Sequence, residues 1–572
     1  MAIPLTSPDH LRQLLNQGRY LEARSESEKL MSTSDDLATK QIHALALSKS
    51  GTPQAAAEFF GPIYQQHPDD AETAGIMGGI YKELFRQTQS QKYALLSRDA
   101  YLNNFAITHN HYTGINAATM SAIAGKFQRG REIAGEVLNG LPESSTDFWE
   151  LSSKAEAKLL NKDPRAAADL YFKAHKLAGS DWGKINIVYN QLWMLNHYML
   201  VPGEILKAFS PPNIAVLVGH MIDHPNRTVP RFPAQFAQTV KDTLTGIIKS
   251  LNVRIGYTSL ACGSDTLFAE VIQESGGELN LFLPFKKDDF LDTSVRFAGE
   301  EWVRRFEKVA EGNIIHDLTH ESYLGNDDLF SFHGRVLFGL AILRGRMLHA
   351  EPYLITVLSE WDRALKEGGT RDLLKLWPFP SRVQNIDPSK FISTASTQPE
   401  KSSATLTTAQ PGRRVAYMAA ISFQGPILNE AHRLAKKMES ELAQEMIALD
   451  VEGETVYAGF TSSYRAISFC KNIIADIERK SPQTKYKVGL HAGPVVVQQL
   501  EDKKTMTGTH TGILKGIFAL AAPGSIYASE PFAASLVLDS GSYSFIHTGT
   551  IHLNEPLGTQ NLYRVDWAAS KT

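Results

Sequence analysis

The spacing of apolar residues changes along the chain and predicts three structured regions and one polar segment. In the first part of the chain, apolar and small residues recur at helical spacing, as Leu11, Leu14 and Leu15 do. Further on, short apolar runs alternate with helical segments, the order expected of a parallel sheet covered by helices. A stretch rich in Ser, Thr, Pro and Gln follows, and strand and helix patterns return after it.

These changes predict a multidomain chain, because 572 residues are too many for one core. An all-α helical repeat is expected over 1–205 and an α/β Rossmann-like domain with a parallel sheet over 206–388. A flexible linker is expected over 389–412, since its composition cannot bury enough apolar surface to offset the entropy of ordering it. An α+β domain completes the chain over 413–572.

The predicted helices of the first region come in pairs. An apolar helix, a small turn and an alanine-rich helix follow one another in LALSKSGTPQAAAEFF (Leu45–Phe60), AIAGKFQRGREIAGEVL (Ala122–Leu138) and AKLLNKDPRAAADLYFKA (Ala157–Ala174). In the last segment, Asp163 can cap the second helix and Pro164 occupies its first turn. This layout resembles a degenerate tetratricopeptide-like array, and HYTGINAAT (His111–Thr119) resembles the helical TRAF-binding region of stress-activated kinase kinases. Both this resemblance and the alternative, an unrelated all-helical domain, imply contact with a protein partner or self-association.

Four strands of the parallel sheet are predicted, the first from the short apolar run Asn213–Gly219 that ends in glycine. The others are expected at Arg254–Ser259, Leu279–Pro284 and Tyr353–Leu358. Helices are expected between and after them, at Pro233–Leu251, Ala261–Glu274, Ser294–Glu311, Leu329–His349 and Arg371–Leu376. Ligands of an open parallel sheet bind at the carboxyl ends of its strands. Three loops there lead small residues into a helix: Gly219-His220, Ser259–Thr266 and Glu367–Thr370. Backbone N–H groups in such loops can hold an anion, although each loop could equally be an ordinary turn.

Together these loops resemble the SLOG superfamily, which includes DNA-processing proteins, phosphoribohydrolases that activate cytokinins and sensors of NAD-derived signals. The resemblance rests on "VLVGH", "SLACGSDTLFAEVIQESGGELNLFLPF" and "EGGTRDLL". It implies a nucleotide or NAD-derived ligand near Gly219 and His220, with no cofactor assigned with certainty. On this reading Gly263, Ser264 and Thr266 face phosphate, and Gly368, Gly369 and Thr370 close the other side. Asp265 either caps the following helix or holds a ribose hydroxyl, and Arg227 and Arg231 either pair with phosphate or are simply solvated.

An enzymatic alternative follows from the catalytic members of that superfamily, which use a carboxylate after a glycine-rich loop to cleave an N-glycosidic bond. Asp372 falls near the position of that carboxylate, and Glu270 is a second candidate on a helix. The glycine loop here is shorter and lacks the preceding proline and second acidic residue. Hydrolysis of nucleoside phosphates or NAD-like molecules therefore stays the alternative to ligand sensing.

The last region resembles a class III nucleotidyl cyclase domain, which implies a ferredoxin-like α+β fold. Three stretches carry the resemblance: Lys487–Val495 (KVGLHAGPV), Glu452–Phe460 (EGETVYAGF) and Thr507–Ser529, which ends in APGSIYAS. Cyclases of this class hold two metal ions with two carboxylates and orient their substrate with an Asn and an Arg. These positions fall on Ala420, Glu454, Gly512 and Gly516, and Lys515 is one residue out of register.

We therefore expect no cyclic-nucleotide synthesis, because the missing groups each supply several kcal/mol of transition-state stabilisation. An intact cyclase partner could restore a site, whereas a homodimer could not. The domain is then a pseudoenzyme that forms a homodimer or larger assembly, or a shell that still binds a nucleotide. No metal site is predicted.

Composition narrows the remaining choices. The net charge of −3 gives no basic face for nucleic acid, which we do not expect as a partner. Only Cys262 and Cys470 are present, as in a reduced compartment, and the N-terminus lacks the pattern of a secretory signal. Apolar stretches such as Val336–Leu343 are too short to span a membrane, so a cytoplasmic protein is expected. The preferred function is signalling or sensing, and a scaffold without ligand is the third possibility.

Overall fold

The computed structural model describes residues 7–567 except 68, 180, 325–326, 360–369, 392–411, 425–427 and 501–502. The chain forms two compact units, Met1–Pro211 with His547–His552 and Pro212–Ile546 with Leu553–Thr572. Most of the predicted linker, residues 392–411, lies outside the described part. The regions predicted as the second and third domains belong to one unit.

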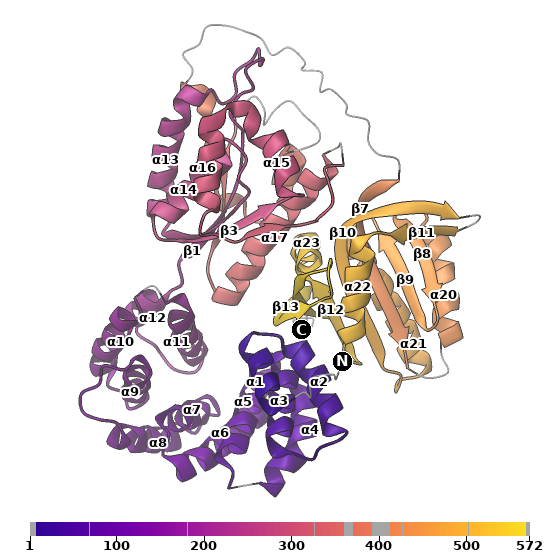
Figure 1. Ribbon diagram of the computed structural model, residues 1–572. Coiled ribbons are helices and arrows are strands. Elements are labelled where there is room, and N and C mark those ends of the chain that lie inside the picture. The colour runs from indigo at the N-terminus through magenta and orange to yellow at the C-terminus, as the bar shows by residue number, and fades with distance from the viewer. Residues whose placement is uncertain are drawn as a thin grey trace. The chain divides into compact units, whose positions relative to one another are not determined.

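The first region is an array of helices that follow one another in pairs (Figure 1). They are α1 (Pro8–Asn16), α2 (Tyr20–Met31), α3 (Leu37–Lys49), α4 (Pro53–Gln66), α5 (Ala71–Thr88), α6 (Gln91–Thr108), α7 (His111–Ile123), α8 (Phe127–Gly140), α9 (Phe148–Leu160), α10 (Pro164–Ala178), α11 (Trp182–Asn196) and α12 (Gly203–Phe209). The predicted all-helical repeat is thereby confirmed.

Side-chain caps explain where several of these helices begin. The Asp163 carboxylate accepts a hydrogen bond from the Ala166 N–H at 3.2 Å, and Pro164 is the first residue of α10, as predicted. Asp36, Asp70 and Asp147 cap α3, α5 and α9 in the same way. A cap of this kind stabilises a helix by about 1 kcal/mol because it satisfies an N–H that the helix itself cannot.

The second region is built on a six-stranded sheet in which every pair of neighbours is parallel. Its elements are β1 (Asn213–Gly219), η1 (Ala234–Phe236), α13 (Ala237–Ser250), β2 (Val253–Thr258), α14 (Ser264–Glu274), β3 (Glu278–Leu283), α15 (Lys287–Ser294), η2 (Arg296–Ala298), α16 (Glu300–Ala310), β4 (Ile315–Asp317), α17 (Asp328–Leu348), β5 (Pro352–Val357), α19 (Thr370–Lys375), η3 (Pro380–Arg382), β6 (Val383–Ile386) and η4 (Pro388–Phe391). The strand order is β4-β3-β2-β1-β5-β6, so the chain reverses its direction across the sheet between β1 and β5.

Helices cover both faces of this sheet (Figure 1). One core joins inward residues such as Ala215 and Leu281 to α13, α14 and α16. The opposite core joins Ile214, Val216 and Ile255 to α17. The four strands predicted from sequence are β1, β2, β3 and β5 to within a residue or two, whereas β4 and β6 were not predicted.

The third region contains a second, mixed sheet. Its elements are β7 (Arg413–Phe423), α20 (Leu428–Glu441), β8 (Met446–Glu452), β9 (Thr455–Phe460), α21 (Ser463–Lys480), β10 (Tyr486–Leu500), β11 (Lys503–Thr507), α22 (Thr509–Leu520), β12 (Ser525–Ser529), α23 (Glu530–Asp539), β13 (Tyr543–His552) and β14 (Thr559–Trp567). The strand order is β13-β14-β12-β10-β7-β9-β8, with β11 paired to β10. The chain order β7-α20-β8-β9-α21-β10 with strands arranged β10-β7-β9-β8 is the ferredoxin-like arrangement.

Helix α17 also packs against the third region, through α23 and β7. An added Cβ at Gly339 would lie 1.9 Å from the Ala534 carbonyl oxygen, so the two helices touch at their backbones. Nearby, the Arg335 guanidinium pairs with the Asp539 carboxylate at 2.5 Å. One continuous core holds residues of the parallel sheet, α17, α23 and β7. A helix that is apolar all round is expected to be buried in this way.

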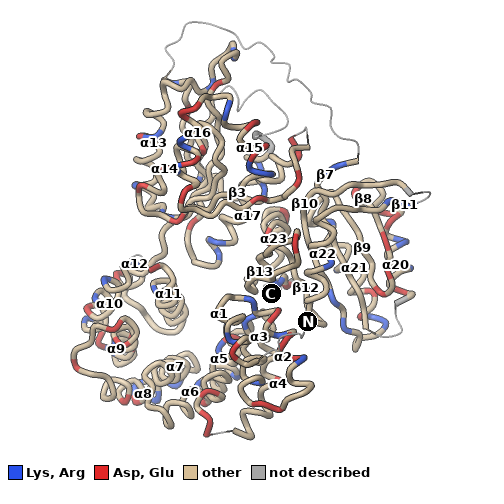
Figure 2. The backbone as a smooth tube through the Cα atoms, in the orientation of Figure 1, with Lys and Arg blue, Asp and Glu red and all other residues tan. Residues whose placement is uncertain are grey.

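Charged residues of both signs alternate along the described elements, and Figure 2 shows no long run of one sign. Within the described residues, no helix combines the length and the apolarity needed to cross a membrane.

Candidate functional site

The carboxyl ends of β1 and β5 form the point where the strand order reverses, which is where an open parallel sheet binds its ligands. The structure brings two of the three predicted loops together there. An added Cβ on Gly219, the last residue of β1, would lie 2.4 Å from the Ser264 hydroxyl oxygen. The start of α14 therefore lies directly against the end of β1, and only glycine permits this approach.

Gly263, just before α14, packs against the backbone of the loop that follows β1. Its φ of +107° is a conformation that side-chain-bearing residues avoid, and a Cβ there would lie 2.7 Å from the Ile222 backbone nitrogen. Gly263 also forms an isolated antiparallel bridge with Met221. This glycine is needed to seat α14 beside the loop after β1.

Ser264 and Thr266 are both buried, and their hydroxyls serve the protein itself. Ser264 donates its hydroxyl to the His220 carbonyl at 2.8 Å, and Thr266 donates to the Ala261 carbonyl at 2.9 Å. In this structure the hydroxyls expected to face phosphate thus stabilise the loop conformation. The Ser264 and Thr266 backbone N–H groups at the start of α14 donate to the His220 and Ala261 carbonyls, so this end offers a ligand the positive end of the helix dipole rather than a set of free N–H groups.

His220 links the ends of the two central strands. Its backbone N–H donates to the Val357 carbonyl of β5 at 3.0 Å. Its ring Nε2 accepts the Ser359 backbone N–H at 3.4 Å, and the side chain is buried. The predicted residue therefore lies at the reversal point, where it ties the loop after β1 to the loop after β5.

Asp265 bonds to the Ser259 hydroxyl and does not cap α14. Burial raises the pKa of this carboxyl to about 6, against the lowering effect of hydrogen bonds from Ser259 and the Ala261 backbone. Of the two roles left open by the sequence, capping is excluded. A carboxyl with this raised pKa at the start of a helix beside a strand end is a group that can exchange a proton or accept a hydroxyl.

The two loop arginines are organised by Asp223. The Asp223 carboxylate pairs with the Arg227 guanidinium at 3.3 Å and accepts the Arg231 backbone N–H at 2.9 Å. It also accepts the Phe232 N–H at 3.0 Å, which closes the loop after β1.

The third predicted loop is only partly described, and of the two alternative catalytic residues only Glu270 has a described side chain. Gly368 and Gly369 lie outside the described residues, and only the backbone of Thr370 and Asp372 is described, in α19. Glu270 is held by Arg305 at 2.7 Å and Lys241 at 2.8 Å. Burial alone would raise the pKa of Glu270, but these hydrogen bonds lower it overall, so the group is a poor proton donor.

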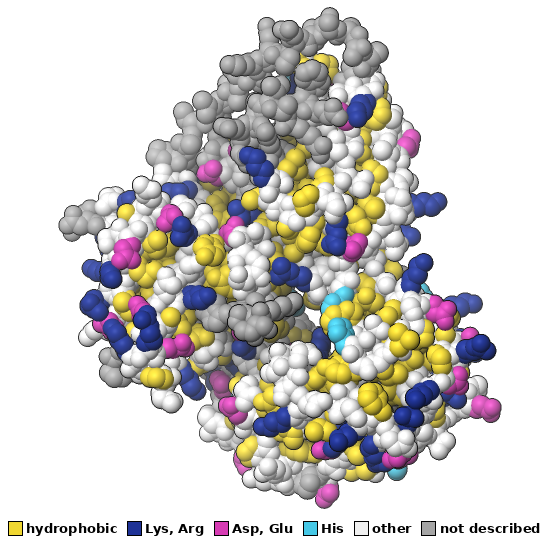
Figure 3. All heavy atoms as spheres, turned by 180° about the vertical axis from the view of Figure 1, so that it is seen from behind, with side chains coloured by type: hydrophobic (Ala, Val, Ile, Leu, Met, Phe, Trp, Pro, Cys, Tyr) yellow, Lys and Arg dark blue, Asp and Glu magenta, His cyan; other side chains and the backbone are white. Residues whose placement is uncertain are grey.

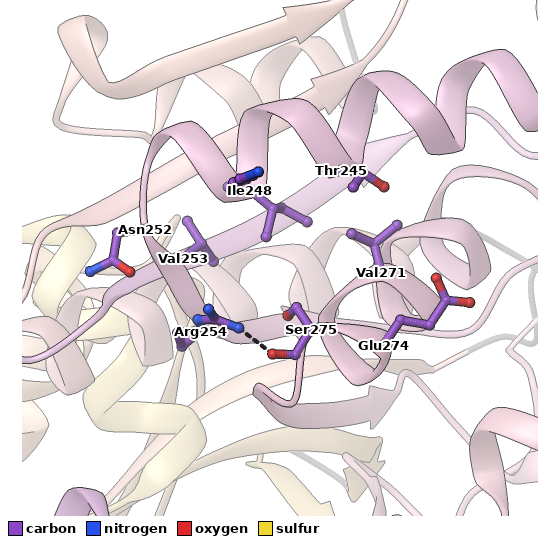
Figure 4. Close-up of a pocket in the computed structure, with 9 residues that line it drawn as sticks. Thr245, Ile248, Asn252, Val253, Arg254, Val271, Glu274 and Ser275 are labelled. Carbon is purple, nitrogen blue, oxygen red and sulfur yellow. Dashed lines mark hydrogen bonds between the residues drawn. The ribbon is translucent and has the colours of Figure 1, made fainter. Parts of the chain in front are cut away.

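A cavity of about 340 Å³ lies at the start of β2 and the ends of α13 and α14, away from the ends of β1 and β5 (Figure 4). Arg254 donates to the Ser275 carbonyl on its wall. None of the predicted site residues lines it.

In the mixed sheet, the position of the first metal carboxylate is filled by an apolar cluster. Ala420 is fully buried on β7, opposite Gly489 of β10 and Tyr457 of β9. Its neighbours on that face include Met418 and Leu514. Glu454 lies exposed in the turn between β8 and β9. Within the described residues, no group of three or more His, Cys, Asp or Glu side chains could hold a metal ion.

The two glycines at the substrate-orienting positions are covered by leucines. A Cβ on Gly516 would lie 2.6 Å from the Leu553 side chain, and one on Gly512 would lie 3.2 Å from Leu557. Lys515, beside them, pairs with Glu452 at 2.8 Å. The face of α22 that would carry an Asn and an Arg is therefore used for packing.

The sequence did not single out a buried histidine pair in this region. His491 on β10 accepts or donates at both ring nitrogens, to the Ser529 hydroxyl at 2.7 Å and to His510 Nδ1 at 2.8 Å. Burial lowers the pKa of both imidazoles, that of His510 to about 3, so both rings are neutral. An added Cβ on Gly493 would lie 2.1 Å from His510 Nδ1, so this glycine makes room for the ring.

A polar network inside the helical array was also missed. Lys82 of α5 donates to Asn116 of α7 at 2.6 Å and to Gln191 of α11 at 2.9 Å, and Gln191 donates to Glu156 of α9 at 2.7 Å. Burial lowers the pKa of Lys82 to about 8 and raises that of Glu156. Every second helix from α5 to α11 is thus connected through polar and charged groups that bond to one another.

The surface of the array also carries exposed aromatic side chains. Tyr112, Phe127, Trp149, Phe172 and Trp193 each have more than a third of their surface accessible. Seen from behind, hydrophobic and charged side chains are interspersed over the surface (Figure 3). Exposed aromatic residues are enriched where proteins bind other proteins.

Comparison with known proteins finds likenesses to parts of the chain. Residues 19–121 match the family described as TPR-S, Tetratricopeptide Repeats-Sensor. A comparison with curated proteins gave no match. The solved guanylate cyclase domain of RhGC from Catenaria anguillulae in complex with GTP is 13% identical, covers 27% of this chain and 97% of its own, and has a TM-score of 0.23.

Two further solved structures are similar over comparable lengths. The adenylate/guanylate cyclase/hydrolase from Silicibacter pomeroyi is 19% identical over 28% of this chain and 98% of its own, with a TM-score of 0.23. A thermophilic TPR protein of Thermus thermophilus is 18% identical over 32% of this chain and 97% of its own, with a TM-score of 0.27. At these TM-scores the solved structures carry no argument about function.

Proposed function

We propose that the protein is a cytoplasmic signalling or sensor protein that binds a nucleotide-derived ligand at the β1–β5 end of its parallel sheet. In this proposal the sheet domain is of the SLOG type, and the helical array binds a protein partner or a second copy of the chain. The cyclase-like domain makes no cyclic nucleotide and serves dimerisation or regulation.

One observation carries the ligand-binding part of the proposal. At the reversal of strand order, Gly219 and Gly263 allow the start of α14 to lie against the end of β1 without any side-chain cap. The positive end of the α14 dipole at such a place favours an anionic group such as phosphate. Asp265 lies in the first turn of the same helix, as a candidate partner for a ribose hydroxyl.

The lack of cyclase chemistry is supported by what occupies the expected site. A carboxylate at Ala420 would have to be buried among apolar groups, which costs several kcal/mol unless it is paired. The Cβ of an arginine at position 516 would already clash with the Leu553 side chain. The apolar packing therefore argues against a dormant site that a single substitution could restore.

The test is incubation of the full chain with Mn²⁺ and a mixture of ATP, GTP, AMP and NAD, followed by mass spectrometry and by calorimetric titration of each compound. We expect the mixture to return unchanged and at least one compound to bind saturably. Asp265→Asn should weaken that binding about tenfold if the carboxylate holds a ribose hydroxyl. Asp242→Asn, which removes the same charge from the exposed face of α13, is the matched control.

Three results would contradict the proposal in different ways. A cyclic nucleotide would show that the third region is catalytic after all. A free base or nicotinamide would favour N-glycosidic hydrolysis, and Asp372 would then be the first residue to replace. If none of the four compounds binds, the protein is better explained as a scaffold without ligand, in which the strand-end loops are ordinary turns.

A further inference from the structure

A second cavity lies in the unit formed by Pro212–Ile546 and Leu553–Thr572, between the end of β4 and the starts of α22 and α23. Its volume is about 110 Å³, the space of about three or four water molecules. Asp317, the last residue of β4, and His320 lie on one wall, and His510 and Glu530 lie at the starts of α22 and α23 on the other. No residue of β1 or β5 lines it.

His510 presents an unsatisfied nitrogen at this cavity. The side chain is 2% exposed, and its Nδ1 is bonded to His491 at 2.8 Å. Its Nε2 is buried and has no hydrogen-bond partner among the described residues. Because Nδ1 is turned toward His491, Nε2 is the ring nitrogen left for a group in the cavity. A buried polar atom without a partner is unfavourable, so a ligand that satisfies it binds more tightly.

The histidine pair allows Nε2 to act as an acceptor. Both rings are neutral, so each carries one proton and one lone pair. If His510 donates from Nδ1 to His491 Nε2, His491 donates from Nδ1 to the Ser529 hydroxyl. His510 Nε2 then carries a lone pair toward the cavity. The two rings lie side by side and nearly coplanar, with centroids 5.1 Å apart and planes inclined by 12°, as expected of rings joined by this hydrogen bond.

The other polar groups of the cavity favour a positive charge. The carboxylate of Asp317 accepts no hydrogen bond from the described residues, and Glu530 accepts one, from the Asn561 amide at 3.2 Å. Burial raises the pKa of both carboxyls, and for Asp317 it outweighs the lowering effect of His320 and Lys287. Among the described residues that line the cavity there is no Lys or Arg. An anion in the cavity would therefore meet two carboxylates and no lining counter-charge of that kind.

We propose that this cavity binds the ammonium or guanidinium head group of a small organic cation. Asp317, Glu530 and His510 Nε2 accept its N–H groups, and the small volume admits the head group while the rest of the molecule extends toward the exposed His316 and His320. A metal ion is disfavoured because no cluster among the described residues could hold one. The site is separate from the proposed nucleotide site.

The test is calorimetric titration of the full chain with agmatine, which carries both head groups, with inorganic phosphate as the probe of opposite charge. We expect saturable binding of agmatine, weakened about tenfold or more by Asp317→Asn and by Glu530→Gln. The half-buried Asp317 makes no hydrogen bond to a described residue that its replacement would break, so the Asn variant should fold. Asp292→Asn, which removes the same charge from an exposed ion pair with Arg296, should bind as the parent does.

The proposal is overturned if agmatine gives no saturable heat, if the two cavity variants bind it as well as the parent does, or if phosphate binds instead and loses affinity when His510 is replaced. Asp265→Asn separates the two sites. It should leave agmatine binding unchanged even where it abolishes nucleotide binding, so that one proposal can fail while the other stands.

Discussion

The buried Asp265 carboxyl should leave a signature in the pH dependence of stability. Its pKa in the folded chain is about 6, above its ordinary value of 3.8, because burial disfavours the charged form. As pH rises from about 4 to about 6, the unfolded chain loses this proton first, so the free energy of unfolding should fall by on the order of 3 kcal/mol. Asp265→Asn should flatten that fall and be more stable than the parent near neutral pH.

Urea unfolding at a series of pH values measures this effect. Asp242→Asn, on an exposed helix face, should keep the parental pH profile because no burial cost is removed there. Identical profiles for Asp265→Asn and the parent would show that the carboxyl is hydrated in solution and that its pKa is close to ordinary.

At the residue scale, the sequence predicted positions better than roles. Gly219 and Gly263 were found because a small residue between a strand and a helix is a local signal. That the hydroxyls of Ser264 and Thr266 turn to the carbonyls of His220 and Ala261 depends on how two loops meet, which spacing alone does not report. His510 lies within a motif that the sequence singled out, yet its role was not recognised, because it is on helix α22 and its partners His491 and Gly493 are on strand β10.

At the scale of elements, α22 crosses β10 over two glycines. Gly489 allows the backbone of Phe518 to approach, and Gly493 allows the ring of His510 to lie flat above the strand. Gly493→Ala should lower the free energy of unfolding by about 1–3 kcal/mol, since the hydrogen-bonded ring cannot move aside. Gly541→Ala, where an added methyl meets nothing, is the control, and equilibrium unfolding of both variants gives the comparison.

A double substitution identifies the cause. In a His510→Ala background the ring is gone, and Gly493→Ala should then cost little. An unchanged cost would place the strain in the strand backbone instead of the histidine.

Strands long enough to show a pattern were predicted well. β1 and β5 are mostly apolar and buried along most of their length, and β2 and β3 have six residues each that end in buried positions, which is enough for a pattern to show. The edge strands β4 and β6 have three and four residues and are only partly buried, so they carry no periodic signal. The ferredoxin-like order of the mixed sheet came from the motif resemblance, because short mixed strands do not reveal their neighbours.

At the scale of the whole molecule, the contact between α17 and α23 makes two predicted domains unfold as one. Gly339→Ala should lower the free energy of unfolding by about 1–3 kcal/mol, because the added methyl meets the Ala534 backbone and one helix must shift. Gly246→Ala, in an exposed turn of α13 with nothing nearby, should instead be neutral or stabilising.

Native-state hydrogen exchange shows which parts respond. In Gly339→Ala, protection should fall together in β1 and β7, which belong to one compact unit, and stay unchanged in α9 of the other unit. Loss of protection in β7 alone would mean that the two sheets open independently.

The packing of α17 against α23, which joins the two sheets in one unit, could not be predicted from the sequence. Val336–Leu343 was noted only as an apolar stretch too short for a membrane, and a glycine within it has no visible partner until α23 is placed beside it. The polar composition of residues 389–412 predicted two separate domains instead.

The close approach of Gly339 to the Ala534 carbonyl also restricts which substitutions the chain can accept in evolution. The contact is made by the backbone of Ala534, which no substitution at that position removes, so glycine at 339 is expected to be retained unless the two helices move apart. Recombination within 392–411 would join a parallel-sheet region from one protein to a mixed-sheet region from another. The facing surfaces of α17 and α23 would then come from different chains and need not be complementary. A junction that looks freely exchangeable in the sequence is therefore a poor point at which to swap one half for a relative's.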